Sequence, residues 1–279
     1  MKTKITKIDL RALEASSLRV SYVEITRKED KSDERRSHAH PECEIYFNLT
    51  GNVSFMVENR IYPVSHGDVI ITRPFEYHHC ILHSDELHRH YCVFFNAPSS
   101  EGLLQKFFDR RAGEGNRLSL SKSEREEFIS ILEALADGES SECERYALIF
   151  KMLTIIEHAK DASEGKQNYL SELDTVLDCI EKTFTEDISV KQLAAEAGMS
   201  VNTLERHFAK SLGMSPSTYI KKKRLSNAAR MLADGCSVIE ACTASGFSDY
   251  SHFIVLFKTA YGITPLKYKK AVLSSRNAP

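Results

Sequence analysis

Histidine and glutamate side chains make up the group in this chain whose types and spacing best suit binding chemistry. His38, His40 and Glu44 lie close together, and His78 and His79 form a second pair. Neutral imidazole and carboxylate groups are ligands for zinc, iron or manganese. They also form hydrogen bonds with small molecules. If His78 and His79 lie on a strand, they point to opposite faces, so only one of them can reach an interior cavity.

Other kinds of chemistry find less support. No Ser/His/Asp or Cys/His arrangement at a recognisable spacing indicates a nucleophilic catalyst, so we expect that this protein is not an enzyme. The seven cysteines are scattered without a Cys-x-x-Cys pair. This favours reduced cytosolic thiols that fill the core, with a redox sensor as the alternative. His83, His88 and His90 fall in a polar stretch, and we expect them to be solvated.

The start and the length of the chain favour a cytoplasmic protein of two domains. The first eleven residues are polar and basic, without the apolar run of a signal peptide. No segment approaches the roughly 18–20 consecutive apolar residues of a membrane helix. A length of 279 residues with 42% apolar content is enough for a core in each of two domains.

Short β-rich segments surround the histidines. Turn signals such as Thr50-Gly51-Asn52 and Ser65-His66-Gly67-Asp68 separate these segments. The predicted strands are residues 18–25, 44–49, 53–57, 68–72, 79–82 and 91–95. Many short strands with tight turns predict a sandwich or a small barrel over residues 19–95.

The order of these signals resembles that of a cupin. The resemblance covers residues 15–95 and rests on His38-Ala-His40-Pro-Glu-Cys-Glu44, then Gly51, Gly67-Asp68, Pro74 and His78-His79. It implies a sensory cavity lined by His38, His40, Glu44 and His78, at the spacing of metal-binding cupins. Ser32 and Glu76 stand where that pattern has glycine. We therefore expect hydrogen-bonding contacts to a ligand, with no metal and no cofactor.

The apolar periodicity becomes helical after residue 101, with apolar positions over residues 103–108, 128–135 and 142–160. Such broad apolar faces bury against the barrel, a partner subunit or both. Residues 161–168 are polar and predict a linker. We expect a cupin-like ligand-binding and dimerisation domain at 1–160, this linker, and a second domain at 169–279.

The last third of the chain contains one pattern twice. Five positions of this pattern recur with the same displacement of 49 residues: Leu204, Phe208, Gly213, Pro216 and Tyr219 correspond to Phe253, Phe257, Gly262, Pro265 and Tyr268. A repeat of this kind indicates two similar supersecondary units. The sequence predicts a helix-turn-helix in each, begun by a capping box at Ser189 or Ser237 and turned at Gly198 or Gly246.

Charge is distributed unevenly between the two parts of the chain. Residues 189–279 contain 13 lysines and arginines against 5 aspartates and glutamates, whereas the remainder contains 24 against 34. This asymmetry indicates that a domain that binds a polyanion is joined to a second domain that does not bind one. Lys221, Lys222, Lys223 and Arg224 lie near the start of the helix that bridges the two units, where we expect them to contact phosphates.

Residues 188–270 resemble the DNA-binding domain of AraC/XylS-type transcription regulators. The likeness is strongest in GFSDYSHFIVLFKTAYGITPLKY, residues 246–268. It implies seven helices, two of which are recognition helices that enter successive major grooves. By position, the residues that face bases are Asn202, Glu205 and Arg206 in the first recognition helix and Tyr250, Ser251 and His252 in the second.

Two departures from this family pattern bear on base reading. Glu205 can only accept hydrogen bonds, for instance from cytosine N4. Ile254 and Val255 stand where the second recognition helix usually carries serine and arginine, which removes a donor. We therefore expect the second unit to read sequence weakly.

These observations predict an α+β protein with a cupin-like barrel plus helices, followed by an all-α domain with two helix-turn-helix motifs. The expected function is sequence-specific DNA binding by a transcription activator controlled by a small molecule, a sugar or related metabolite, in the cupin domain. A homodimer and contact with RNA polymerase are further expectations from the resemblance. The alternative is a metal-dependent cupin enzyme, or a metal or redox sensor, joined to a DNA-binding domain.

Overall fold

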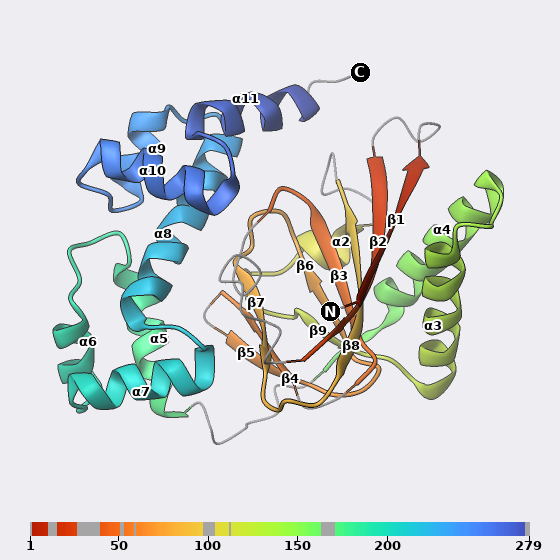
Figure 1. The fold of residues 1–279 in the computed structure, drawn as a ribbon, viewed down its shortest axis with the longest axis horizontal. Helices are drawn as coiled ribbons and strands as arrows, with labels where there is room; N and C mark the ends of the chain where they lie inside the picture. Colours follow the sequence, from red (N-terminus) through yellow and green to blue (C-terminus); the bar gives the residue numbers. More distant parts are fainter. Residues whose placement is uncertain are drawn as a thin grey trace. The chain divides into compact units, whose positions relative to one another are not determined.

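The computed structural model describes residues 2–10, 16–26, 40–50, 53–58, 60–96, 104–111, 113–162 and 171–276. The described residues up to 162 form one compact unit, and those from 171 onward form a second. The first unit contains the strands and the second is helical, as Figure 1 shows. The predicted α+β, two-domain class is confirmed.

Two antiparallel sheets form the first unit. The larger sheet contains, in spatial order, β1 (Lys2–Leu10), β2 (Ser16–Ile25), β8 (His88–Phe95), β3 (Cys43–Asn48), β6 (Val69–Thr72), β9 (Arg117–Ser119) and β10 (Lys160–Asp161). The smaller sheet contains β5 (Arg60–Val64), β4 (Val53–Val57) and β7 (His78–Leu82). Successive side chains on a strand point to opposite faces, so β3, β6 and β8 each contribute to two different interiors.

Strand β3 shows this division. Cys43, Ile45 and Phe47 belong to the core between the larger sheet and the helices. Tyr46 belongs instead to the core between the two sheets, together with Phe55 and Val57 of β4. Glu44 has the same parity as Tyr46, so its side chain also faces the smaller sheet.

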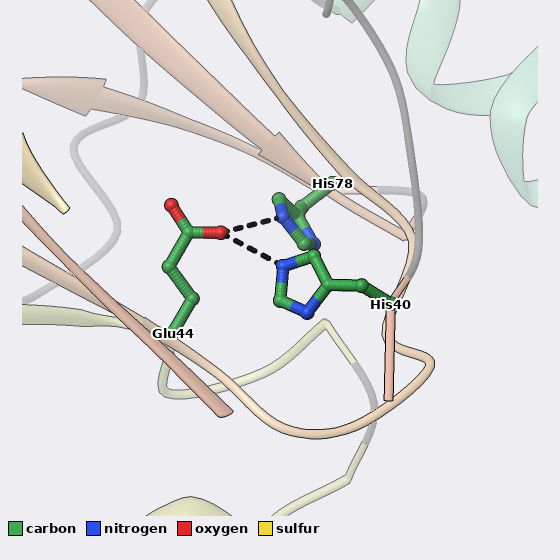
Figure 2. Close-up of side chains that lie close together, drawn as sticks. All are labelled: His40, Glu44 and His78. Carbon is green, nitrogen blue, oxygen red and sulfur yellow. Dashed lines mark hydrogen bonds and ion pairs between the residues drawn. The ribbon is translucent and has the colours of Figure 1, made fainter. Parts of the chain in front are cut away.

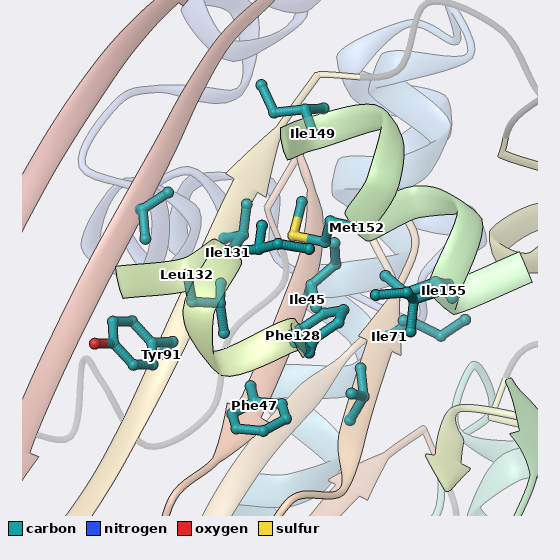
Figure 3. Close-up of a cluster of buried hydrophobic side chains, with 14 of the residues drawn as sticks. Ile45, Phe47, Ile71, Tyr91, Phe128, Ile131, Leu132, Ile149, Met152 and Ile155 are labelled. Atoms are coloured by element: carbon teal, nitrogen blue, oxygen red, sulfur yellow. The ribbon is translucent and has the colours of Figure 1, made fainter. Parts of the chain in front are cut away.

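Helices cover the other face of the larger sheet. These are α2 (Gln105–Phe108), α3 (Lys122–Asp137) and α4 (Glu142–His158). Ser121 and Ser141 begin α3 and α4 with capping boxes. Phe128 and Met152 are fully buried against the sheet, within the cluster that Figure 3 shows. The expected apolar faces therefore pack against the sheet-rich domain.

Four strands were not predicted from the sequence, namely β1, β5, β9 and β10. Strand β1 pairs only with β2 and lies at an edge of the larger sheet. Strand β5 contains Pro63 and is also an edge strand. Proline is tolerated there because one side of an edge strand makes no ladder hydrogen bonds. Strand β10 includes Asp161, which the sequence had placed in the linker; residues 163–168 lie outside the described residues.

The second unit contains seven helices among its described residues, the number that the family resemblance implies. They are α5 (Ser171–Thr183), α6 (Val190–Glu196), α7 (Val201–Leu212), α8 (Pro216–Ala233), α9 (Val238–Ala244), α10 (Tyr250–Tyr261) and α11 (Pro265–Arg276). Ser189 and Ser237 form the predicted capping boxes, and Ser200 and Ser215 cap the helices that follow them. Within the described part of the chain, no helix is long and apolar enough to cross a membrane.

Candidate functional site

The first helix-turn-helix consists of α6 and α7. Leu204, Phe208 and Leu212 of α7 are all fully buried, and their spacing fixes one face of the helix against the core. Asn202, Glu205 and Arg206 are exposed. The structure therefore presents an amide, a carboxylate and a guanidinium together on the solvent side of this helix.

The second helix-turn-helix consists of α9 and α10. Phe253 and Phe257 are fully buried and anchor α10 in the same way. The exposed residues in the first turn of α10 are Tyr250, Ser251 and His252. Val255 is 61% exposed and Ile254 is half-buried, so an aliphatic side chain lies on the outer surface of this helix. Asp249, which the sequence analysis missed, caps α10 by accepting from the His252 N–H at 2.9 Å.

The four cations at the start of α8 have different surroundings. Lys221 is exposed and Lys222 is half-buried. Lys223 is buried, with its Nζ 2.5 Å from a carboxylate oxygen of Glu181 on α5. We had expected Lys223 and Arg224 to contact phosphates. In the structure, both side chains instead contact other parts of the protein.

Arg224 is engaged at the end of α5. Its Nε donates to the Phe184 carbonyl at 2.5 Å, and its Nη2 donates to the Glu186 carbonyl at 2.6 Å. The last carbonyls of a helix lack partners within the helix and carry partial negative charge, which favours a cation. Arg224 therefore ties α8 to the segment after α5. No spacing rule links these positions, which lie about forty residues apart in the sequence.

Three of the four predicted ligand-binding residues converge in the first unit. Glu44 of β3 accepts from His40 Nε2 at 3.1 Å and from His78 Nε2 at 2.9 Å, both on its Oε2 atom (Figure 2). His38 lies outside the described residues. His78 is paired with Val57, which faces between the sheets, whereas the neighbouring His79 faces the other way. His78 thus faces the space between the sheets, while His79 is also buried but points away from that space.

The electrostatics of this cluster favour an ion pair. Burial alone would raise the pKa of Glu44, but hydrogen bonds from His40 and His78 outweigh it and hold the pKa well below its usual range. Burial alone would lower the pKa of His78, but the hydrogen bond and charge of Glu44 outweigh it and raise the pKa. His78 Nδ1 donates to the Glu76 carbonyl at 2.7 Å, so both ring nitrogens of His78 act as donors.

The expectation that His88 and His90 are solvated is wrong for this fold. Both lie on β8, and alternation places them on the same face as Cys92, toward the smaller sheet. His88 is 4% exposed, and its Nε2 lies 2.8 Å from the Tyr46 hydroxyl. Burial lowers the pKa of His88 to about 4 and that of His90 to about 3. Both rings are therefore neutral at pH 7.

Glu76, at a position where the cupin pattern has glycine, holds a loop in place. Its carboxylate accepts from Arg110 Nη1 at 2.7 Å and Nη2 at 2.6 Å. The Gly113 N–H and the Asn116 side chain donate to the same carboxylate. Burial alone would raise the pKa of Glu76, but these donors, Arg110 foremost, keep it below its usual value. The network fixes the backbone whose carbonyl orients His78.

A cavity of about 320 Å³ opens beside His88. Its lining combines apolar and polar side chains from the turn after β3, the start of β4, the end of β7, the turn before β8 and the start of β8: Thr50, Val53, Leu82, Ser84, Glu86, Leu87 and His88. Small-molecule sites are typically concave and mostly apolar, with a few polar groups that fix orientation. His88 joins this cavity to the interior, because its ring also bonds Tyr46.

Comparison with known proteins agrees with this architecture. A family model described as an AraC-like ligand binding domain matches residues 21–153, and one described as a helix-turn-helix domain matches residues 193–271. The HTH-type transcriptional activator RhaS of Salmonella paratyphi B is 24% identical over 241 residues, which cover 82% of this chain and 85% of RhaS.

Two solved structures are among those that match parts of this chain. An AraC-type transcriptional regulator from Chromobacterium violaceum is 28% identical with a TM-score of 0.36, and the match covers 40% of this chain and 97% of that one. Apo ToxT from Vibrio cholerae is 14% identical with a TM-score of 0.38, and the match covers 91% of this chain and 97% of that one. With both family models matched in chain order, and with two helix-turn-helix units that follow a sheet-rich domain along the chain, this chain belongs to the AraC family of transcription regulators.

Proposed function

We propose that this regulator is an activator, and that a small molecule bound between the two sheets of its first unit controls its binding to DNA. The observation that carries the proposal is the pair of helix-turn-helix units in a basic domain, each presenting polar residues on an exposed helix face. The similarity to an activator, RhaS, supports the direction of regulation.

Base reading falls to the exposed residues of α7 and α10. Asn202 offers a side-chain amide of the kind that pairs with adenine, and Arg206 offers the guanidinium fork that pairs with guanine. Glu205 accepts from cytosine N4. Tyr250 and Ser251 offer hydroxyl groups and His252 an imidazole, whereas Val255 offers only apolar contact, for example with a thymine methyl group. Lys221 and Lys222 serve as phosphate contacts.

The effector contacts are His40, Glu44 and His78, with His38 retained as a prediction. The charged Glu44–His78 pair offers strong hydrogen bonds to a polar ligand. Neutral His88, which bonds Tyr46, offers a further polar contact at the separate cavity that it lines. A sugar or related metabolite suits such a mixture of donors and acceptors. The protein itself then performs no catalysis; it works in the cytoplasm by changing its DNA affinity when the ligand binds.

Two partners complete the proposal. The exposed side chain of Phe150 on α4 supports a homodimer built on the helical face of the first unit. Contact with RNA polymerase follows from the assignment as an activator.

Glu44→Gln tests the proposal directly. The substitution keeps the shape of the side chain but removes the charge that the two histidines share. A metabolite panel is first screened on the full chain by thermal shift, since a ligand that binds only the folded state raises apparent stability. We expect the variant to lose the effector-dependent change in DNA affinity while its basal DNA affinity stays unchanged. A variant that responds to the effector like the unsubstituted chain would contradict the assigned site.

A further inference from the structure

Three potential ligand atoms from separate parts of the first unit meet in a buried site. The atoms are His40 Nε2, just before β3, the carboxylate of Glu44 on β3, and His78 Nε2 on β7, all within 4.8 Å of one another (Figure 2). The side chains of Glu44 and His78 are 6% and 1% exposed, whereas that of His40 is 15% exposed. The site is therefore mostly dry, and His40 lies on its solvent side.

The orientation of the His78 ring is fixed by a hydrogen bond from its second nitrogen. Its Nδ1 donates to the Glu76 carbonyl at 2.7 Å, which directs Nε2 toward Glu44. Histidines that bind metals usually donate their other ring N–H to a carbonyl or carboxylate, which sets the tautomer and holds the ring. The carboxylate of Glu76 is itself held by Arg110 and Gly113. The support for His78 is therefore rigid before any ion binds.

We propose that His40, Glu44 and His78 bind one divalent transition-metal ion, with at least one coordination position left open toward the space between the sheets. Two imidazole nitrogens and one carboxylate oxygen suit zinc, iron or cobalt better than magnesium or calcium, which prefer oxygen ligands. Four ligands placed about 2.0–2.2 Å from zinc lie about 3.3 Å apart in a tetrahedron. The observed separations of 3.1 and 2.9 Å from Glu44 Oε2 are close to this value, and all three ligand atoms lie within 4.8 Å of one another.

The three side chains surround a position that two hydrogen bonds now occupy. Both histidines donate to the same carboxylate oxygen. A bound cation would take the place of those two hydrogen bonds and would coordinate the same three atoms. This inference deepens the proposed function and rests on it for its biological role, namely that occupancy of the site between the two sheets alters DNA affinity.

Cobalt(II) and zinc serve as probes on the full chain after treatment with a chelator and dialysis. Cobalt(II) in a site of low coordination number absorbs visible light, and equilibrium dialysis counts the zinc ions bound. The variants are His40→Ala, Glu44→Gln and His78→Ala. His158→Ala is the matched control, because His158 is exposed on α4 and donates to the Thr154 carbonyl of its own helix, outside the proposed site.

We expect one ion for each unsubstituted chain and for each His158→Ala chain. Loss of a partner behind a metal ligand typically weakens binding about 10–100-fold, so loss of a ligand itself should weaken it by at least that much in all three variants. If His78→Ala fails to fold by circular dichroism, His40→Ala decides, because its side chain is the most exposed of the three.

Binding of no ion by the unsubstituted chain would overturn the proposal, and so would three variants that bind zinc as tightly as the control. The cysteines or other histidines would then hold the ion. DNA affinity is measured in parallel, with and without zinc. A chain that binds no metal but still binds specific DNA would sink the metal site and leave the proposed function standing. A chain that binds zinc with no effect on DNA affinity would keep the metal site and remove its role as effector.

Discussion

The two helix-turn-helix units share a buried frame but differ on their surfaces. Leu204 and Phe208 in α7 and Phe253 and Phe257 in α10 are all fully buried, at the same displacement along the chain. The exposed positions differ: α7 presents amide, carboxylate and guanidinium groups, whereas α10 presents a tyrosine, a serine, a histidine and a valine. Buried positions thus fix where each helix lies, and the exposed ones set what it can contact. The buried residues can therefore stay the same while the exposed residues, and with them the contacts to DNA, change.

The turns of the two units also differ in their surroundings. Gly198 and Gly246 both adopt positive φ, at 65° and 80°. A Cβ atom added at Gly198 meets nothing within 4 Å, whereas one added at Gly246 lies 2.6 Å from the Thr185 carbonyl oxygen. Gly246 therefore serves both turn geometry and close backbone packing against the segment after α5, while Gly198 serves turn geometry alone.

The largest expected effect comes from substituting these two glycines. Gly198→Ala should cost roughly 1–2 kcal/mol of stability, the strain of a left-handed residue with a side chain. Gly246→Ala should cost about 3 kcal/mol or more, because a clash with rigid backbone adds an overpacking penalty of about 1–3 kcal/mol. Urea unfolding of the full chain measures both losses of stability, with loss of DNA binding as the signal that reports on the second unit. Equal losses would show that the packing of Gly246 relaxes freely.

The helical part of this fold was the more predictable one. Ser189 and Ser237 begin helices through contacts only three residues away, so the sequence contains the whole signal. The roles of Lys223 and Arg224 were not predictable, because their partners Glu181, Phe184 and Glu186 reach them only when α5 packs on α8. A run of cations looks alike whether it faces solvent or a helix end.

The sheet-rich part was less predictable for a related reason. Glu44 and His78 come from different sheets, and only family spacing suggested that they meet. His88 and His90 follow a polar stretch that masked the start of β8. Their alternation with Cys92 was the signal that could have placed them inside. Strand β5 was missed because Pro63 argues against a strand unless the strand is known to lie at an edge.

The second prediction separates reading of bases from contact with phosphates in the first unit. Arg206→Ala should weaken binding to the cognate site by roughly 1–3 kcal/mol and relax specificity at one base pair. Lys221→Ala should weaken all sequences alike and reduce the slope of log affinity against log salt by about 0.9. Binding titrations on cognate and random duplexes at several salt concentrations check both. Equal weakening of both duplexes by Arg206→Ala would contradict its assigned role.

The third prediction compares the two halves of the binding site. Each mismatched base pair under α7 should cost roughly 1–3 kcal/mol, the usual range for specific contacts. Mismatches one helical turn away, under α10, should cost clearly less, because the exposed Val255 forms no hydrogen bond to a base edge. A saturation scan of single-base substitutions across the operator measures all positions in one series. Penalties of equal size in the two halves would contradict the comparison.

The smallest expected effect comes from giving α10 the donor that it lacks. Val255→Arg places a guanidinium at a position that is 61% exposed, so we expect little change in folding. One added phosphate contact should steepen the slope of log affinity against log salt by about 0.9 and tighten binding a few-fold at low salt. Val255→Met is the matched control, since it adds length without charge. If Val255 instead faces a protein, the salt slope stays unchanged in both variants and transcription activation falls in both. Binding titrations combined with a transcription assay on the same two variants therefore decide whether the outer face of α10 meets DNA or a protein partner.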